Sequence, residues 1–498
     1  MPVFSTVLPP LLDYPNHLAR MHLLAEGGGA FYSVQWAVLP NLAEDLIVPP
    51  LARVIPLDLA AKLFLILIFA LIGGGVIWLN RVATAGWRLW PLLGFLFLYN
   101  RILLWGFVNY LFGLGVALGG IALWLTLERR RWRLRVFSSL FVALACFFSH
   151  IAAFGVYALA IIGVEILPAV AEVRDLQWPE LGRRIAIGVL QFIAPAALWL
   201  YFRHDAPSST VSYAGFWRKA DLLFSVFDNY DRAFDVVCFA LFLALIGWLI
   251  WTRRLGLAPR LAAAAGVVFA AYLVLPSQIH GGSGADHRLP TAFFLLLVAG
   301  SAPNFPSPRI AKAVGVIAAL VLVLRLGMIE RIWREADQVY SADLAAIDAL
   351  PQGSKIAIAH PDLFHVAPIP EVHLALLAIQ RREAFVPTLF AIAGQQPVAL
   401  KPAFAALADA APPQPLWAML TAAQSADRAL LPAMLEQFDF VVIVDKRPIN
   451  LPPHRCLAPV SVQPTFQIYS ISHSSDCAVP TASQLSTTID RKAVHARG

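Results

Sequence analysis

Three polar side chains share one face of a predicted helix near the start of the chain. Asp13, His17 and Arg20 are spaced i, i+4 and i+7, which places them along one side of an α-helix. We expect Asp13 to cap this helix and Gly27 to end it. A carboxylate, an imidazole and a guanidinium together could activate a hydroxyl and hold a phosphate. The alternative is an ordinary amphipathic helix that lies on a membrane surface with its polar face solvated.

A second group of polar side chains lies in a glycine-rich segment, residues 277–290. Glycines let backbone N–H groups approach a ligand, and the arginine and histidine side chains can meet phosphate oxygens. We expect Asp286 to orient Arg288 and Pro290 to start the next helix. A purely structural ion pair between Asp286 and Arg288 is the alternative. The side chains expected to bind a ligand are His280, Asp286, His287 and Arg288.

Other candidates interrupt or precede apolar sequence. Glu44 and Asp45 form an acidic pair that either belongs to the site or is an exposed loop pair. Arg101 and His150 interrupt two long apolar stretches, and ionisable groups at membrane depth are candidates for functional sites. If those turns reach water, both are ordinary turn residues. Asn109 could hydrogen-bond a sugar or satisfy the backbone of a broken helix.

Membrane helices are the elements that must position these residues. Of the 498 residues, 59% are hydrophobic and only 14% are charged, and the mean hydropathy is +0.68. A soluble domain has about 25% charged residues, whereas a membrane span needs about 20 apolar residues. We therefore expect about ten spans, with two long stretches forming helical hairpins. The apolar stretches are 59–79, 89–127, 136–167, 185–201, 236–251, 261–275, 290–299 and 311–326.

The distribution of Lys and Arg predicts the orientation of these spans. Basic residues gather in the segments 81–88, 128–135, 172–184, 253–260 and 303–312. Such loops stay in the cytoplasm, so residues 1–57 and the chain after about residue 328 are expected outside. The net charge of +7 therefore indicates topology and not nucleic-acid binding. Because no signal peptide is visible, we expect either a first membrane helix upstream of Met1 or direct translocation of the short tail.

The sequence changes character after about residue 328. The β-branched runs 355–359 and 438–444, and an alternating run at 466–472, are separated by helical stretches at 371–381 and 427–436. This order predicts a small α/β domain. The expected divisions are an outward loop with an amphipathic helix at 1–57, a helix bundle at 58–328, the α/β domain at 329–480 and a disordered tail at 481–498.

The cysteines agree with an outward C-terminal domain. Cys456 and Cys477 flank the last predicted strand, and in an oxidising compartment we expect them to form a disulfide. Cys146 and Cys238 lie inside apolar helices as small core residues. The sequence contains no CxxC motif and no Cys/His metal spacing, so nothing in it supports a divalent metal, and use of one is left open.

This arrangement resembles the GT-C superfamily, membrane glycosyltransferases that use polyprenyl-phosphate-linked sugars. The resemblance rests on an acid in the first outward loop, a short helix after it, membrane helices of uneven length and an outward C-terminal domain. It implies that Asp13 is the general base, with His17 sharing the proton. It also implies that Arg288, with Arg101, neutralises the lipid phosphate. The chain departs from many members because Tyr14, and not a second acid, follows Asp13.

The implied reaction transfers a sugar from a polyprenyl-phosphate donor to a glycan or lipid acceptor of the cell envelope. It would take place on the periplasmic face of a bacterial inner membrane, with membrane lipid as a further partner. Alternatives are a transporter or flippase for a lipid-linked glycan, and a non-catalytic envelope assembly protein. The chain shows no internal repeat, and Glu165 is the one acid deep in an apolar stretch, which argues against a transporter.

Overall fold

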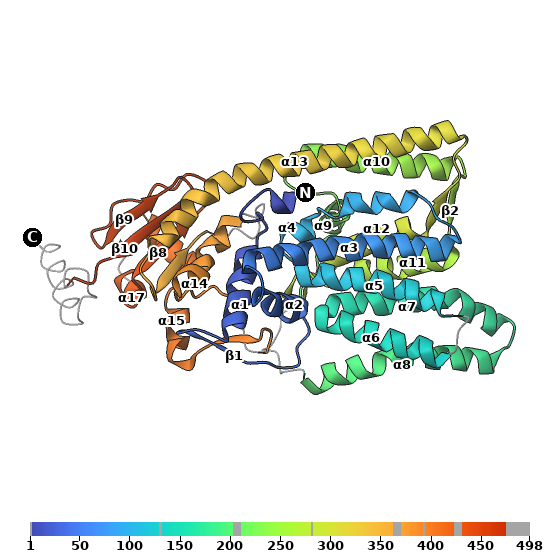
Figure 1. The fold of residues 1–498 in the computed structure, drawn as a ribbon, viewed down its shortest axis with the longest axis horizontal. Coiled ribbons are helices and arrows are strands. Elements are labelled where there is room, and N and C mark those ends of the chain that lie inside the picture. The colour runs from blue at the N-terminus through green and yellow to red at the C-terminus, as the bar shows by residue number, and fades with distance from the viewer. Residues whose placement is uncertain are drawn as a thin grey trace, which may run out of the picture. The chain divides into compact units, whose positions relative to one another are not determined.

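The computed structural model is mainly helical (Figure 1). It describes residues 2–128, 132–202, 211–279, 282–361, 370–391, 394–422 and 431–474. His280, Cys477, the arginines at 129–131 and the predicted tail at 481–498 lie outside the described residues. The proposed pairing of Cys456 with Cys477 therefore stays a prediction.

The chain divides into two compact units. Unit 1 contains Met1–Leu11, Gln35–Asp337 and Ile392–Pro397, and unit 2 contains Leu12–Val34, Gln338–Ala391 and Val398–Gly498. Residues 12–34, which carry Asp13, His17 and Arg20, thus belong to the same unit as the C-terminal residues and not to the helix bundle.

Unit 1 is built from apolar helices that lie side by side (Figure 1). Seven helices in the described ranges are long and apolar enough to cross a membrane. They are α3 (Leu57–Thr84), α5 (Val108–Thr126), α6 (Trp132–Ser149), α7 (Ile151–Arg174), α8 (Trp178–Phe202), α10 (Arg232–Trp251) and α13 (Pro308–Asp348). Shorter apolar elements are η2 (Trp90–Phe97) with α4 (Arg101–Leu104), α11 (Pro259–Val274) and α12 (Leu289–Gly300). This is the architecture of a membrane protein, and the larger count of about ten spans stays a prediction.

Polar residues end these helices where the sequence predicts breaks. In the stretch 136–167, α6 ends at Ser149 and α7 begins at Ile151. His150 occupies the N-cap between them, and its Nδ1 accepts a hydrogen bond from Ala152 N at 3.0 Å. A side-chain acceptor satisfies a backbone N–H that has no partner within the helix. The residue at position 150 therefore favours a helix break at this point.

The stretch 89–127 contains two breaks. Asn100 caps α4, and its Oδ1 accepts from Leu103 N at 3.0 Å. Gly106 then adopts a left-handed conformation with φ of 87° before α5 begins at Val108. Since the left-handed region is strained for residues with a Cβ, Gly106 permits the second turn.

Glycines allow α3 and α5 to approach closely. A Cβ at Gly75 would lie 2.8 Å from Leu118 Cβ, and a Cβ at Gly115 would lie 2.6 Å from Leu71 Cβ. Small residues at such crossings are typical of membrane helices, whose association depends on close packing.

One end of the bundle is held by an ion-pair network around Glu165 of α7. Its Oε1 accepts from Trp124 Nε1 at 2.7 Å, Arg135 Nη2 at 3.0 Å and Arg260 Nη2 at 3.1 Å. Arg184 Nη1 donates to the other carboxylate oxygen at 2.5 Å. These partners belong to α5, α6, α8 and α11, so three of the predicted basic segments meet at the same end of the bundle.

Unit 2 contains a four-stranded sheet with the order β6-β8-β10-β9. The strands are β6 (Ile356–Ala359), β8 (Phe440–Val444), β9 (Leu457–Val462) and β10 (Phe466–Ile471). β6 pairs with β8 in parallel, and the other pairs are antiparallel. The strands predicted at 355–359, 438–444 and 466–472 coincide with β6, β8 and β10. The sequence did not predict β9, which is the largely exposed edge strand.

The rest of unit 2 consists of short helices and a two-stranded ribbon. The ribbon pairs β1 (Tyr32–Val34) with β7 (Val398–Leu400) in antiparallel fashion. The helices are α1 (Tyr14–Glu26), η4 (Pro370–Leu376), α14 (Leu377–Arg382), α15 (Ala405–Ala410), α16 (Pro413–Thr421) and α17 (Leu431–Leu435). The helix α1 packs against η4 and α14.

Candidate functional site

A buried carboxylate lies at the centre of a polar cluster in unit 1. Asp286 begins η3 (Asp286–Arg288), directly before α12, and its residue is 0% exposed. Its Oδ2 accepts from Ser277 Oγ at 3.0 Å and lies 3.4 Å from Lys219 Nζ. The prediction that Asp286 orients Arg288 is wrong, because residues two apart in a 3-10 turn point in different directions. Asp286 pairs with Lys219 instead.

Lys219 holds this carboxylate from the short helix α9 (Phe216–Phe224). Its Nζ also donates to Tyr272 O at 2.7 Å and to Leu275 O at 3.0 Å. An ammonium has three donors, so Asp286 and the two carbonyls engage all of them. Lys219 therefore fixes the position of Asp286 and leaves no N–H for a ligand.

His287 stands beside this pair. Its residue is 3% exposed, its Nε2 lies 3.8 Å from Asp286 Oδ1, and its ring centroid is 5.0 Å from that of Trp105. Burial lowers the pKa of His287, and the charges of Arg218 and Arg101 act in the same direction. The imidazole is therefore neutral near pH 7. Its Nδ1 makes no hydrogen bond within the described ranges, so it is positioned to bind a ligand group.

Arg288 is held by the loop that precedes α12. Its Nη1 donates to Gly284 O at 2.6 Å, and its guanidinium lies 4.3 Å from the centroid of the Phe107 ring. Tyr110 OH donates to Arg288 O at 2.5 Å, and Gly284 has a φ of 69°. The helix α12 has a proline in its first turn, as predicted for Pro290. The guanidinium is thus fixed by contacts on its plane and at one edge.

Arg101 and His150 border the same cluster. Arg101 Nε donates to Asp228 Oδ2 at 2.5 Å, and Nη1 to Asp221 Oδ2 at 3.2 Å. The ring of His150 lies 6.0 Å from that of Tyr110. Burial, and secondarily the charge of Arg288, lowers the pKa of His150 well below its usual value. Both residues are therefore more than solvated turn residues.

Positive charge exceeds negative charge in this cluster. Among the residues that the structure describes, the carboxylates that pair with its cations are Asp221, Asp228 and Asp286, whereas the cations are Arg101, Arg218, Lys219, Arg232 and Arg288. Preorganised cations of this kind stabilise phosphate groups. This excess of cations is the electrostatic environment that an anionic ligand would require.

Glu44, Asp45 and Asn109 lie elsewhere in unit 1 and have structural surroundings. Glu44 and Asp45 are in the first turn of α2 (Ala43–Ala52) and are each 1% exposed, so they are not the exposed loop pair that the sequence allowed. Acidic side chains are favourable at a helix N-terminus. Asn109 Oδ1 accepts from Glu44 N at 2.7 Å, and Nδ2 donates to Asn41 O at 3.1 Å. Asn109 therefore supports the backbone at the start of α2.

In unit 2, α1 has the predicted bounds but not the predicted environment. It runs from Tyr14 to Glu26, and Gly27 follows in a left-handed conformation with φ of 81°. The Asp13 side chain does not cap the helix by a hydrogen bond. Both the polar and the apolar faces are buried, so the expectation of a membrane-surface helix is wrong.

The polar face of α1 is buried because it has partners within unit 2. Asn16 Nδ2 donates to Thr388 O at 3.2 Å, and its Oδ1 accepts from Phe390 N at 3.0 Å. Arg20 is 0% exposed, and its Nη2 lies 3.3 Å from His17 Nδ1. Polar groups that are hydrogen-bonded can be buried at a low cost in free energy. The spacing of charges along the sequence does not reveal such partners.

Asp13 and His373 form a second acid–imidazole pair, which the sequence did not predict. His373 of η4 places its Nε2 3.5 Å from Asp13 Oδ1, and both residues are buried. The His373 ring also packs edge to face against Phe390, with centroids 5.6 Å apart. No spacing motif links residues 13 and 373, so only the tertiary structure identifies this pair.

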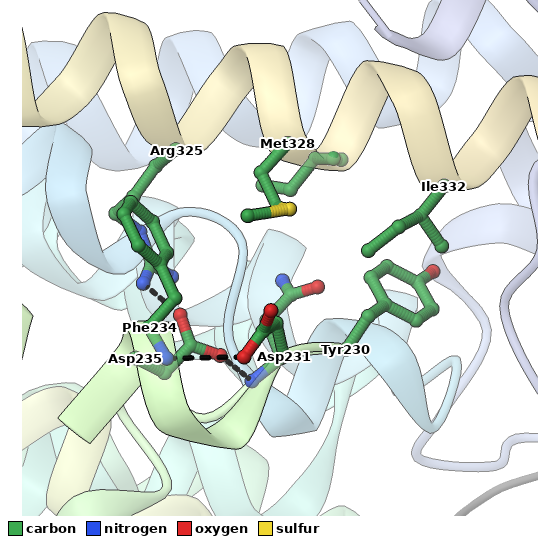
Figure 2. Close-up of a pocket in the computed structure, with 9 residues that line it drawn as sticks. Tyr230, Asp231, Phe234, Asp235, Arg325, Met328 and Ile332 are labelled. Atoms are coloured by element: carbon green, nitrogen blue, oxygen red, sulfur yellow. Dashed lines mark hydrogen bonds and ion pairs between the residues drawn. The ribbon is translucent and has the colours of Figure 1, made fainter.

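A pocket lined by both apolar and charged side chains lies between α10 and α13 (Figure 2). Arg325 and Asp235 point toward each other there and form an ion pair. Arg325 Nη2 also donates to Tyr99 O and Phe227 O, both at 3.0 Å. The Asp231 side chain caps α10 by accepting from Phe234 N at 3.0 Å. Because Arg325 and Asp235 neutralise each other, we interpret this pocket as a contact that holds α10 and α13 together.

Comparisons with family models, with curated proteins and with solved structures return no match for this chain. The function must therefore be argued from the chemistry of the residues themselves.

Proposed function

We propose that this protein is a membrane glycosyltransferase that uses a polyprenyl-phosphate-linked sugar. The proposed acceptor is a glycan or lipid of the cell envelope, and the reaction takes place on the periplasmic face of a bacterial inner membrane. In this proposal the chain crosses the membrane about ten times and its C-terminal α/β domain is periplasmic.

The cationic cluster of unit 1 is the observation that carries this proposal. It places Arg288 and His287 at the N-terminus of the apolar helix α12, with Arg101 paired to two carboxylates nearby. A polyprenyl-phosphate donor combines an anionic phosphate with a long apolar chain. Cations among membrane helices match both parts of that molecule, and they stabilise the phosphate as it leaves the sugar.

The proposed chemistry is direct displacement at the anomeric carbon. The oxygen of the acceptor hydroxyl forms the new bond to that carbon, and the bond between the carbon and the phosphate oxygen breaks. The acceptor proton passes to the carboxylate of Asp13, while the polyprenyl phosphate leaves as an anion. His373, 3.5 Å from Asp13, and His17 next to Arg20 are proposed to orient the base.

Transfer of labelled sugar from polyprenyl-phosphate donors tests this proposal directly. Purified protein in lipid vesicles should transfer label to an envelope acceptor, and Asp13→Asn should abolish transfer while membrane insertion is retained. Glu26→Gln is a matched control, because Glu26 is an exposed acid at the end of the same helix. Full transfer by Asp13→Asn would reject Asp13 as the base.

A transporter or flippase for a lipid-linked glycan is the second candidate. The observation in its favour is the buried ion pair of Asp235 and Arg325 between two candidate spans, since such pairs occur on transport pathways. Movement of labelled lipid-linked glycan across vesicles without cleavage of the sugar bond would support transport and contradict the transferase.

The proposed orientation has its own test. Reporter fusions in the segment 129–135 should report the cytoplasm, and fusions at residue 350 should report the periplasm, because loops rich in Lys and Arg are retained inside. The same compartment at both positions would contradict the topology.

A further inference from the structure

We propose that residues 211–217, here called the aromatic segment, anchor α9 in the headgroup region of the bilayer. The anchor sets the depth at which the cationic cluster meets lipid phosphates. Its consequence for donor binding rests on the proposed function, whereas the insertion itself does not.

The aromatic segment presents large apolar side chains to its surroundings. Val211 is 52% exposed, Tyr213 67%, Phe216 75% and Trp217 81%. The rings of Phe216 and Trp217 pack edge to face with centroids 5.1 Å apart. Large apolar side chains that are exposed together within one short segment indicate an interaction surface.

The opposite face of α9 is fixed to the helix bundle. Leu222 is 1% exposed, and Lys219 Nζ reaches Tyr272 O, Leu275 O and Asp286. Tyr272 OH also donates to Lys219 O. The aromatic segment is thus the outer side of a docked helix, and its position is coupled through Lys219 to Asp286.

The course of the chain identifies the bilayer as the occupant of this surface. The segment lies between α8, which ends at Phe202, and α10, which begins at Arg232, and both helices are candidate membrane spans. Trp and Tyr rings concentrate at the level of the lipid headgroups. Arg218, which follows Trp217 directly and is exposed, adds the attraction of a cation for anionic lipids.

The anchor would act on the cluster through two neighbouring cations. Arg218 is close enough for its charge to act on His287, and Lys219 holds Asp286. With Trp217 at headgroup depth, both cations lie at the level where the phosphate of a membrane lipid resides. The lipid can then reach the cluster without leaving the bilayer.

Spin labels measure the depth of the aromatic segment. A nitroxide at Trp217→Cys in lipid vesicles should collide more often with oxygen than with a water-soluble nickel complex. A label at Gln338→Cys, an exposed position, should show the reverse, and Phe216→Cys repeats the measurement should Trp217→Cys not fold. Nickel access at residues 216 and 217 as high as at residue 338 would overturn the proposal.

Lipid binding measures the consequence of the anchor. In lipid nanodiscs, Trp217→Ala should bind a long-chain polyprenyl phosphate about tenfold more weakly. Binding of a water-soluble, ten-carbon isoprenyl phosphate should stay unchanged, because that ligand arrives from water. Trp251→Ala is the matched control, since Trp251 is 84% exposed at the other end of α10.

These two measurements separate the anchor from the function. If the wild type binds neither phosphate, the proposed transferase function fails, and the depth of the labels alone decides whether the anchor exists. If the labels lie at headgroup depth but Trp217→Ala and Trp251→Ala weaken long-chain binding equally, the specific role in donor binding is overturned.

Discussion

Two of the acid–imidazole pairs, one in each unit, are built from the same residue types but have different surroundings. In unit 1, Asp286 lies 3.8 Å from His287 and is also bonded to Lys219 and Ser277. In unit 2, Asp13 lies 3.5 Å from His373, at the start of the buried helix α1. The first carboxylate pairs with an ammonium, whereas the second lies beside an imidazole.

This difference indicates a division of chemical roles. A carboxylate that is bound by both an ammonium and a hydroxyl is held in one position by these two partners. It serves to position the groups around it, which here include His287 and the neighbouring arginines. A carboxylate beside an imidazole, as Asp13 lies beside His373, combines two groups that commonly act in general acid–base catalysis. We therefore propose that unit 1 binds the phosphate and that Asp13 accepts the proton.

The sharpest test of this division compares Asp13→Asn with Asp286→Asn. Asp13→Asn should reduce sugar transfer by about 10²- to 10⁴-fold, the usual contribution of a general base, without weakening lipid-phosphate binding. Asp286→Asn should lower sugar transfer and should also weaken lipid-phosphate binding, because Lys219 loses its charged partner. Equal losses of binding in the two variants, measured by titration in nanodiscs, would remove the distinction between the units.

The buried ion pair should appear as a large effect on stability. Lys219→Met leaves Asp286 without its cation, and breaking a buried pair costs about 3–5 kcal/mol. The free energy of unfolding in a mild detergent measures this loss. The double variant Lys219→Met/Asp286→Asn should regain part of it, and the absence of any recovery would show that the two residues act independently.

A smaller effect on donor binding is expected when Arg288 is replaced by lysine, which keeps the positive charge but lacks the planar guanidinium. Arg288→Lys should weaken donor binding about tenfold, because an ammonium cannot reproduce the two parallel hydrogen bonds of a guanidinium. Arg288→Ala should weaken binding further. Unchanged binding in a folded Arg288→Ala variant would leave Arg288 with a structural role only.

The smallest expected effect is a pH dependence of stability from His287. Because burial lowers its pKa, the unfolded chain takes up a proton below about pH 6.5 that the folded chain does not. This contribution is complete above pH 6.5 and is lost as the pH falls toward the folded pKa. Between pH 7 and 5.5 the loss is about 1 kcal/mol. Melting curves of His287→Gln should show a shallower decline than the wild type.

The sequence by itself determined the local features of this protein. Apolar length indicated the membrane helices, and Gly27 ended α1. Arg101 and His150 marked two breaks, at which the side chains of Asn100 and His150 cap the next helix. β-branched runs located three strands of the sheet. These features depend on neighbouring residues, since caps, turns and strand propensities act over a few positions.

Only the tertiary structure decided which polar groups meet. Lys219 and Asp286 are 67 residues apart, and Asp13 and His373 are 360 residues apart. From the sequence we expected Asp286 to orient Arg288, its neighbour along the chain. We also expected the polar face of α1 to be solvated, whereas unit 2 buries it. The partner of a buried charge depends on which elements pack together and on the rotation of each helix, and no local spacing encodes either.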